Sequence, residues 1–393
     1  MARNRVFYQS ESVFAGPDGA TGVHVDLAAG STNHDEEVNP IKRLQRIQSA
    51  NYSFTVDRTD VNQFGELAAI DRIILTSPTV SMDFSYILAN VSNESILGFK
   101  TDGSTSAITN IIDKTKDERN YFIKTSAAGV DNIGSEVALG SGDTATDGVI
   151  GIGNGFITSY TAEGAVGDFP TASVSVEGLN MTFQTNTSGN IIPGVNPVDG
   201  SKCGWLTYVL PTGIEGTLAN KNHSSNSTDL TTALRPGDIS FTLYDHGTSD
   251  DASVDGFGAI ADANVQSFSC SFDMTRTPIE KLGSRFAFSR EIDFPINVSF
   301  TVDAVMGDLT NGNLADIVDS DGAYDIKVTL KGKDINDTTA EEKATYEVKK
   351  AKLDSQEFTS DIGSNKSVSL TFTAQVGGPN QTNVGLFIGG KTS

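Results

Sequence analysis

The sequence predicts an all-β protein with minor helices, built from two tandem copies of one domain. The chain has 393 residues, among them 39 Gly and many Ser, Thr and Asn, a composition that suits short strands joined by turns. Several segments alternate polar and apolar residues with a period of two, the pattern of a strand with one buried and one solvated face. One of these stretches, IQSANYSFTVDR, is written again two hundred residues later as VQSFSCSFDMTR.

The repeat links residues 48–85 to residues 266–303 without a gap. Every pair is separated by 218 positions (266 − 48 = 218). An ungapped match of this length, which keeps arginine and glycine in the connecting segment, indicates duplication of a domain. The identical pairs are Gln48/Gln266, Ser49/Ser267, Ser53/Ser271, Phe54/Phe272, Arg58/Arg276, Thr59/Thr277, Gly65/Gly283, Ala69/Ala287, Arg72/Arg290, Val80/Val298 and Ser81/Ser299.

The expected elements follow one another in the same order in both halves. Alternating or apolar runs predict an opening strand, a long strand pair, and a returning strand pair, with a helical patch between the two pairs. In the first half these elements lie at 6–16, 47–58, 79–86, 108–119 (helical), 155–164 and 171–181. In the second half they lie at 238–247, 265–276, 297–303, 312–319 (helical), 345–355 and 367–376.

Composition sets the expected domain boundaries at 1–190 for the first copy and 235–378 for the second. Residues 191–234 form a connection rich in Gly, Asn and Ser, in which the apolar run WLTYVL predicts a strand. Residues 379–393 form a glycine-punctuated extension, either a disordered tail or an arm that pairs with a neighbour through VGLFI. GIGNGF (151–156) reads as a turn.

The charge balance disfavours tight binding of nucleic acid. With 28 basic and 50 acidic residues the net charge is −22, which repels phosphate. Such a charge suits a surface along which DNA passes without sticking, and it equally suits simple solubility. Cys203 and Cys270 do not make a disulfide framework, and Cys270 is expected to be a buried, reduced thiol.

The sequence shows no catalytic, cofactor or metal motif. GIGNGF lacks the GK[ST] ending of a phosphate loop, no GxSxG element occurs, and the four histidines lack metal-ligand spacing. The N-terminus has no apolar stretch of the signal-peptide kind, and no run of about 18 apolar residues occurs. We therefore expect a non-enzymatic protein, without cofactor, that is made and folded in the cytoplasm.

The repeated phrase QSANYSFTVDRTDVNQFGELAAIDRIILTSPTVSMDFSYIL, followed by NGFITSYTAEGAVGDFPTASVSVEGLNM, resembles the tail tube proteins of long-tailed bacteriophages. The resemblance covers most of residues 1–190 and, more weakly, 235–378. It implies a β-sandwich domain whose inner strands join those of its neighbours into a β-barrel around a channel. Some members carry two such domains per chain and form trimeric rings with pseudo-sixfold symmetry.

The resemblance also implies a location, partners and candidate residues. The chain would be a virion protein assembled in the host cytoplasm, with itself, the tape-measure, sheath, baseplate and tail-terminator proteins as partners, and genomic DNA only in transit. The candidates for lining the channel, all on expected polar faces that could equally be solvated outer faces, are Asp57, Asp83, Glu163, Glu177, Asp273 and Asp303. The candidates for structural or ring-to-ring contacts are Arg58, Gly65, Arg72, Arg276, Gly283 and Arg290.

Three other readings stay open at this point. A baseplate hub or tail-tip protein uses the same duplicated domain but usually carries inserted domains. A surface adhesin or S-layer-like array predicts a secretion signal and short linkers. A carbohydrate-active β-sandwich enzyme needs a carboxylate pair set among aromatic residues, yet Trp205 is the single tryptophan.

Overall fold

The computed structural model describes residues 11–17, 42–125, 148–185, 193–202, 239–247, 264–305, 322–331, 342–360, 365–376 and 378–390. Within these residues the protein is predominantly β, with antiparallel strand pairs and two short helices, α1 (Ser92–Leu97) and α2 (Thr109–Ile112). The all-β class with minor helices is therefore confirmed. WLTYVL and the helical patch expected at 312–319 lie outside the described residues.

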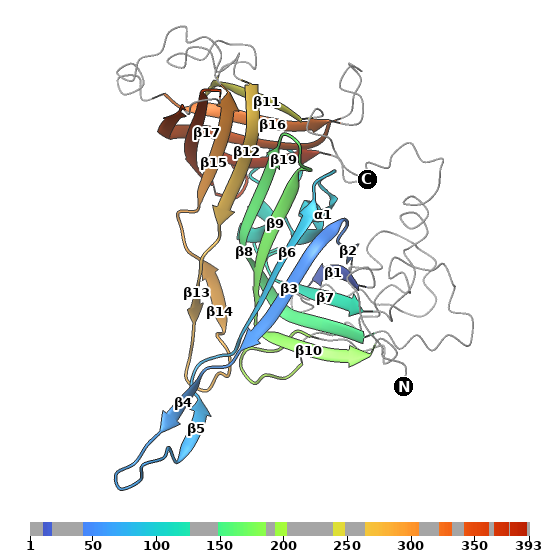
Figure 1. The fold of residues 1–393 in the computed structure, drawn as a ribbon. Helices are drawn as coiled ribbons and strands as arrows, with labels where there is room; N and C mark the ends of the chain where they lie inside the picture. Colours follow the sequence, from blue (N-terminus) through green and yellow to red (C-terminus); the bar gives the residue numbers. More distant parts are fainter. Residues whose placement is uncertain are drawn as a thin grey trace, which may run out of the picture.

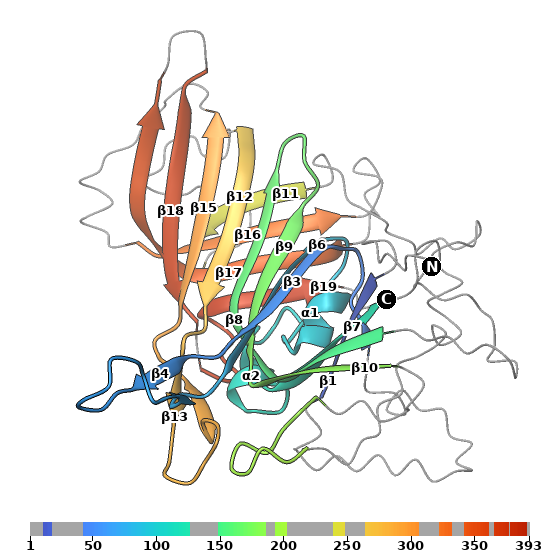
Figure 2. The same cartoon turned by 60° about the horizontal axis from the view of Figure 1, so that its bottom comes forward.

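Strands from both halves of the chain form one continuous sheet, here called the central sheet. The first four strands come from the N-terminal half and the last four from the C-terminal half (Figures 1 and 2). The order is β3 (Ile47–Thr55), β6 (Thr79–Ile87), β9 (Thr171–Gly178), β8 (Gly148–Ala165), β12 (Asn264–Asp273), β15 (Asn297–Val305), β18 (Ser367–Gln375) and β17 (Glu342–Thr359).

The two longest strands, β8 and β17, each belong to two sheets. The first part of β8 pairs with β7 (Arg119–Thr125) and β10 (Asn180–Thr185), and β7 continues to β1 (Glu11–Pro17) and β2 (Lys42–Arg43). The first part of β17 pairs with β16 (Tyr324–Lys331) and β19 (Gly385–Gly390), and β16 continues to β11 (Ile239–Asp245). Each half therefore has a flanking sheet joined to the central one through a shared strand.

One face of the central sheet is apolar and packs against the flanking sheets. Along β6 and β15 every second residue is buried, as the period-two pattern predicts. Phe84 of β6 lies 6.3 Å from Tyr121 of β7, and Phe372 of β18 lies 5.9 Å from Tyr324 of β16, between ring centroids. Cys270 is buried and unpaired, and burial raises the pKa of its thiol to about 12. The expectation of a buried, reduced thiol there is confirmed, whereas Cys203 lies outside the described residues.

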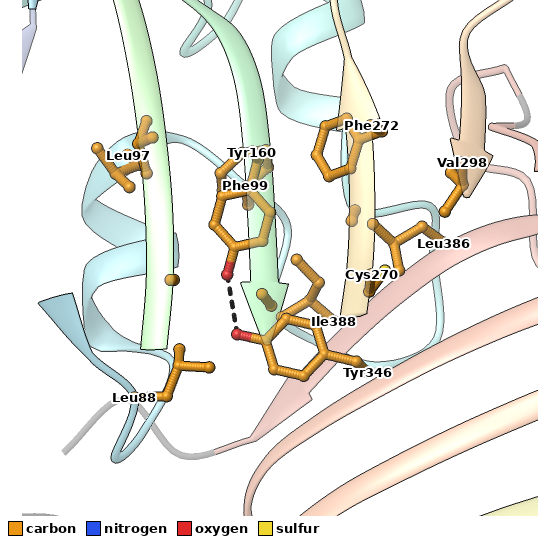
Figure 3. Packing of buried hydrophobic residues seen from close by; sticks show 14 of the residues in the cluster. Leu88, Leu97, Phe99, Tyr160, Cys270, Phe272, Val298, Tyr346, Leu386 and Ile388 are labelled. Atoms are coloured by element: carbon orange, nitrogen blue, oxygen red, sulfur yellow. Dashed lines mark hydrogen bonds between the residues drawn. The ribbon is translucent and has the colours of Figure 1, made fainter. Parts of the chain in front are cut away.

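A buried polar cluster lies where the two halves meet. The hydroxyls of Tyr160 in β8 and Tyr346 in β17 are 2.9 Å apart (Figure 3). Both donate to the carboxylate oxygen Oε1 of Glu94 in α1, at 3.0 and 3.2 Å, and Tyr86 donates to the same atom at 2.8 Å. Glu94 is fully buried, and this burial raises the pKa of its carboxyl, while hydrogen bonds from the three tyrosines partly oppose the shift.

Strand registers in the N-terminal half recur in the C-terminal half. Among the strands described so far, each except β2 has a counterpart displaced by a constant number of residues: 228 for β1 and β11 (239 − 11), 218 for β3 and β12 and for β6 and β15 (265 − 47), 205 for β7 and β16 (324 − 119) and for β10 and β19 (385 − 180), and 196 for β8 and β17 and for β9 and β18 (353 − 157). The irregularities recur too. Gln48 and Gln266 are both skipped at bulges, and Asn154 and Lys350 both have positive φ, 53° and 59°.

Two expected segments have a different structure. The helix expected at 108–119 is a single turn, α2, because the charged run after Ile112 offers no apolar positions with which to continue a buried face. Arg119 already belongs to β7. VGLFI is neither a tail nor an arm to a neighbour, because β19 pairs with β17 of the same chain, where Leu386, Phe387 and Ile388 are buried.

The segment GIGNGF, expected as a turn, lies inside strand β8. Gly151 and Gly153 are needed because the segment Pro193–Val195 packs directly on this part of the strand, whereas a Cβ atom on Gly155 would meet the ring of Tyr121 at 2.8 Å. A Cβ atom on Gly153 would collide with the backbone of Pro193. Asn154 anchors the same segment, since its Oδ1 accepts from the backbone N–H of Val195 at 2.8 Å. Close packing against the strand therefore explains the glycine run.

Candidate assembly interface

The second face of the central sheet is mostly polar, with apolar residues such as Ile87, Phe156 and Val305 near the ends of the strands. Neighbouring hydroxyls meet across the strands, as between Ser49 and Ser85 (2.7 Å) and between Ser53 and Ser81 (2.9 Å). Among the described strand positions on this face there are six carboxylates and one cation, Lys352, which lies opposite Thr373. The six are Asp83, Glu163, Glu177, Asp273, Asp303 and Glu357.

The structure brings five of the six sequence-predicted acidic residues onto this one face. Asp57 does not join them, because β3 ends at Thr55 and Asp57 lies exposed beyond it. Glu357, which the sequence analysis missed, takes the sixth place. Asp303 accepts from Ser267 at 2.7 Å and Glu163 from Thr171 at 3.2 Å, so both carboxylates are held by hydroxyls of adjacent strands.

The two halves are joined by a strand pairing, here called the inner seam. Ser159–Ala165 of β8 pair antiparallel with Ser267–Asp273 of β12, and Phe272 lies opposite Tyr160. Their rings are 5.6 Å apart and Phe99 packs against both. Phe272 is 2% exposed in this seam. The inner seam is thus a closed, well-packed edge-to-edge contact.

The central sheet ends in two edges that have no partner strand among the described residues, here called the free edges. One is β3, which pairs with β6 alone, and the other is the segment Ser355–Thr359 of β17, which pairs with β18 alone. Each carries a large exposed apolar side chain, Phe54 (59%) and Phe358 (48%). A long unpaired edge with exposed aromatic residues is a pairing surface unless something covers it.

Two hairpins extend from the end of the central sheet (Figure 1): β4–β5 (Arg58–Val61 with Asp71–Ile74) and β13–β14 (Arg276–Ile279 with Ser289–Ile292). The second hairpin is docked on the N-terminal half. Arg276 forms a buried ion pair with Asp117 and stacks over Phe156 at 4.7 Å. Arg290 binds Glu177 at 2.6 Å.

The first hairpin has no comparable contact among the described residues. Arg58 is exposed, and Arg72 binds Asp60 of its own hairpin at 2.5 Å with both side chains at least half exposed. Gly65 and Gly283 occupy the loops of the two hairpins with positive φ, 93° and 83°. The arginines that recur at an offset of 218 residues therefore have two environments: buried and paired across the halves at 276 and 290, solvent-exposed at 58 and 72.

No group of three or more His, Cys, Asp and Glu side chains within the described part of the chain is placed to hold a metal ion. The helices described are too short to cross a membrane. No model of a known protein family matches the chain, and no curated protein matches its sequence.

Proposed function

We propose that this chain is a structural protein of a virion that self-assembles into stacked rings, forming the hollow tail tube of a long-tailed bacteriophage. The observation that carries the proposal is the central sheet itself. It is largely polar on one face and apolar on the other, and its two free edges have no partner strand within the described part of the chain, while the corresponding edges pair with each other at the inner seam.

In this proposal the two halves are tandem copies of one tail-tube domain. Their strands have the same order, and their registers differ by one constant for each strand, bulges included. Loops tolerate insertion and registers do not, so constant offsets along strands that change only between strands are what a duplicated domain leaves behind.

A closed ring removes the open edges. A contact between unlike edges, repeated by rotation, closes into a ring, and stacked rings give a tube. Three chains supply 24 strands (three times the eight of the central sheet). At ~4.8 Å per strand the circumference is about 115 Å and the diameter about 37 Å before strand tilt is counted, which leaves room inside for double-stranded DNA.

The polar face would line the channel. A surface of hydroxyls with six carboxylates and a single lysine, Lys352, per chain offers phosphates little to bind, so DNA is expected to pass without sticking. The proposed partners are further copies of the chain along the tube, with tape-measure, sheath, baseplate and tail-terminator proteins at its surfaces and ends.

Negative-stain electron microscopy of the concentrated, purified protein tests this proposal. Hollow filaments with a regular axial repeat, and end-on views with three chains in each ring, are the expected result. Monomers at every salt and protein concentration would overturn the tube and favour a baseplate hub, in which the same domains need other tail proteins to close the ring.

A further inference from the structure

The residue pairs of the inner seam predict which residues would pair if the two free edges met, because each edge is the counterpart of one strand of the seam. At the seam Ser269 lies opposite Glu163, and Cys270 opposite Ala162. The counterparts of 269 and 270 on β3 are Asn51 and Tyr52 (269 − 218 = 51), and those of 163 and 162 on β17 are Thr359 and Phe358 (163 + 196 = 359).

We propose that the β3 edge of one chain pairs antiparallel with Ser355–Thr359 of a second copy, with Asn51 opposite Thr359, Tyr52 opposite Phe358 and Thr55 opposite Ser355. This inference rests on the proposed function, since it names the residues by which neighbouring chains would meet. The partner is a second copy because β3 and Ser355–Thr359 are the counterparts of the two strands that pair at the inner seam. They lie at opposite edges of one sheet, so the same pairing can form only between two chains.

Exposure supports this partner. Phe54 is 59% exposed, whereas Phe272, its counterpart in the inner seam, is 2% exposed. Phe358 is 48% exposed, whereas its counterpart, Ala162, is fully buried. The two surfaces that the inner seam buries are thus the two surfaces left uncovered at the ends of the sheet.

The side chains fit this register on both faces. On the apolar face the proposed pairing brings Tyr52 against Phe358, two aromatic residues of the kind that stabilise cross-strand pairs. On the polar face it brings Asn51 beside Thr359 and Ser53 beside Glu357, which continues the hydroxyl and carboxylate surface without a break. A shift by one residue would place apolar-face residues of one chain opposite polar-face residues of the next, for example Phe358 opposite Asn51 or Ser53.

The hairpin contacts of the inner seam are not repeated at this second seam. In the N-terminal half, Phe156 contacts Arg276 and Glu177 binds Arg290. The counterparts of Phe156 and Glu177 in the C-terminal half are Lys352 and Thr373 (156 + 196 = 352; 177 + 196 = 373), which cannot make the same contacts with an arginine. The proposed contact between chains is therefore carried by the strand edges, and Arg58 and Arg72 take no equivalent ion pair in it.

Disulfide trapping tests the register directly. The full chain carrying Asn51→Cys together with Thr359→Cys is oxidised under mild conditions and run on a non-reducing gel. Residues directly opposite in an antiparallel pair are about 5 Å apart, within reach of a disulfide. We expect most of the protein to move from 41.5 kDa to covalent multiples of that mass, and to return on reduction.

The matched control combines Asn51→Cys with Ser355→Cys. In the proposed register these positions are four residues out of line, roughly 14 Å apart, beyond disulfide reach. The two single cysteine variants reveal any cross-link through the native cysteines. Cys270 is buried and is not expected to contribute.

The outcomes separate the two proposals. Filaments by electron microscopy together with cross-linking in the 51–359 variant, and not in the 51–355 variant, support both. Filaments without the 51–359 cross-link, or with the 51–355 cross-link instead, overturn the register and leave the tube standing. A chain that stays monomeric and uncross-linked under every condition overturns both.

Discussion

Replacing Glu94 with glutamine removes the carboxyl group at the centre of the buried polar cluster that it forms with Tyr86, Tyr160 and Tyr346. The carboxyl is fully buried, and its pKa is raised mainly by that burial. In the unfolded chain the same group ionises near its ordinary pKa of about 4.3. Between these two pKa values the native protein holds a proton that the unfolded chain has lost.

The size of the effect follows from this single proton. Where the native state binds one more proton than the unfolded state, the free energy of unfolding falls by about 1.4 kcal/mol for each unit that the pH rises. The stabilising contribution is complete below the unfolded pKa and is lost as the pH climbs to the raised, native value. Glutamine has no proton to lose, so Glu94→Gln is expected to abolish this slope.

Urea unfolding followed by circular dichroism, at pH 4 to 8 and at high dilution, measures the slope. The free energy of unfolding of Glu94→Gln, relative to that of the wild type, should increase as the pH rises. Tyr346→Phe removes a hydrogen bond that favours the ionised carboxylate, so the pKa of Glu94 should rise further in this variant. The fall in the free energy of unfolding should then continue to higher pH. Parallel pH profiles for the wild type and Glu94→Gln would refute the reasoning, because they would mean that the carboxyl binds protons equally in both states.

Three further predictions compare duplicated or paired positions. Phe272→Ala is expected to lower the free energy of unfolding by about 3–5 kcal/mol. Phe54→Ala, at the equivalent but exposed position, should change it by about 0.5 kcal/mol or less in the monomer. Chemical denaturation measures both values. Arg276→Met should cost about 3–5 kcal/mol because it leaves Asp117 buried without its ion pair, while Arg58→Met should be close to neutral in the same assay. Gly98→Ala should lower the melting temperature and reduce the free energy of unfolding by about 2 kcal/mol or more. The φ of this residue is +109°, and the new Cβ would lie 2.6 Å from the Lys116 carbonyl oxygen.

Each comparison has a contrary outcome. Equal losses for Phe272→Ala and Phe54→Ala would show that β3 is covered in the monomer. A neutral Arg276→Met would mean that Asp117 finds another partner or is solvated. For the glycine, Gly65→Ala is the control, since its φ is +93° but no atom lies within 4 Å of the added Cβ. If Gly98→Ala were no worse than Gly65→Ala, the contact with Lys116 would not limit that position.

Alternation of polar and apolar residues predicts the strands that have one solvent-exposed face, and it misses the strands that are buried on both faces. β6 and β15 alternate between buried and more exposed residues, so their sequences show the period directly. In β7 the first six residues are all buried, and in the first part of β8 seven consecutive residues, from Gly151 to Ile157, are buried. No period of two survives there, so β7 and β16 are not visible in the sequence, and the start of β8 resembles a glycine turn.

The extent of the repeat is hidden for a related reason. The offset between counterparts is 228 for β1 and β11, is 218 from β3 and β12 to β6 and β15, and then becomes 205 and 196, because the segments between strands differ in length. An ungapped comparison therefore ends where the first loop of different length begins. Glu357 escapes for a local reason: the bulge at Asp354 shifts the alternation by one residue, so its face cannot be read from the preceding strand.

The strand pairing between β8 and β12 has a consequence for how such a protein responds to dilution. Because both strands belong to one polypeptide, their encounter is intramolecular, with an effective concentration on the order of millimolar that does not fall when the solution is diluted. It also avoids the loss of translational and rotational freedom that joining two separate molecules entails, roughly 4–15 kcal/mol. In a six-domain ring, three of the six junctions would then form during folding itself, and protein concentration would govern only the other three.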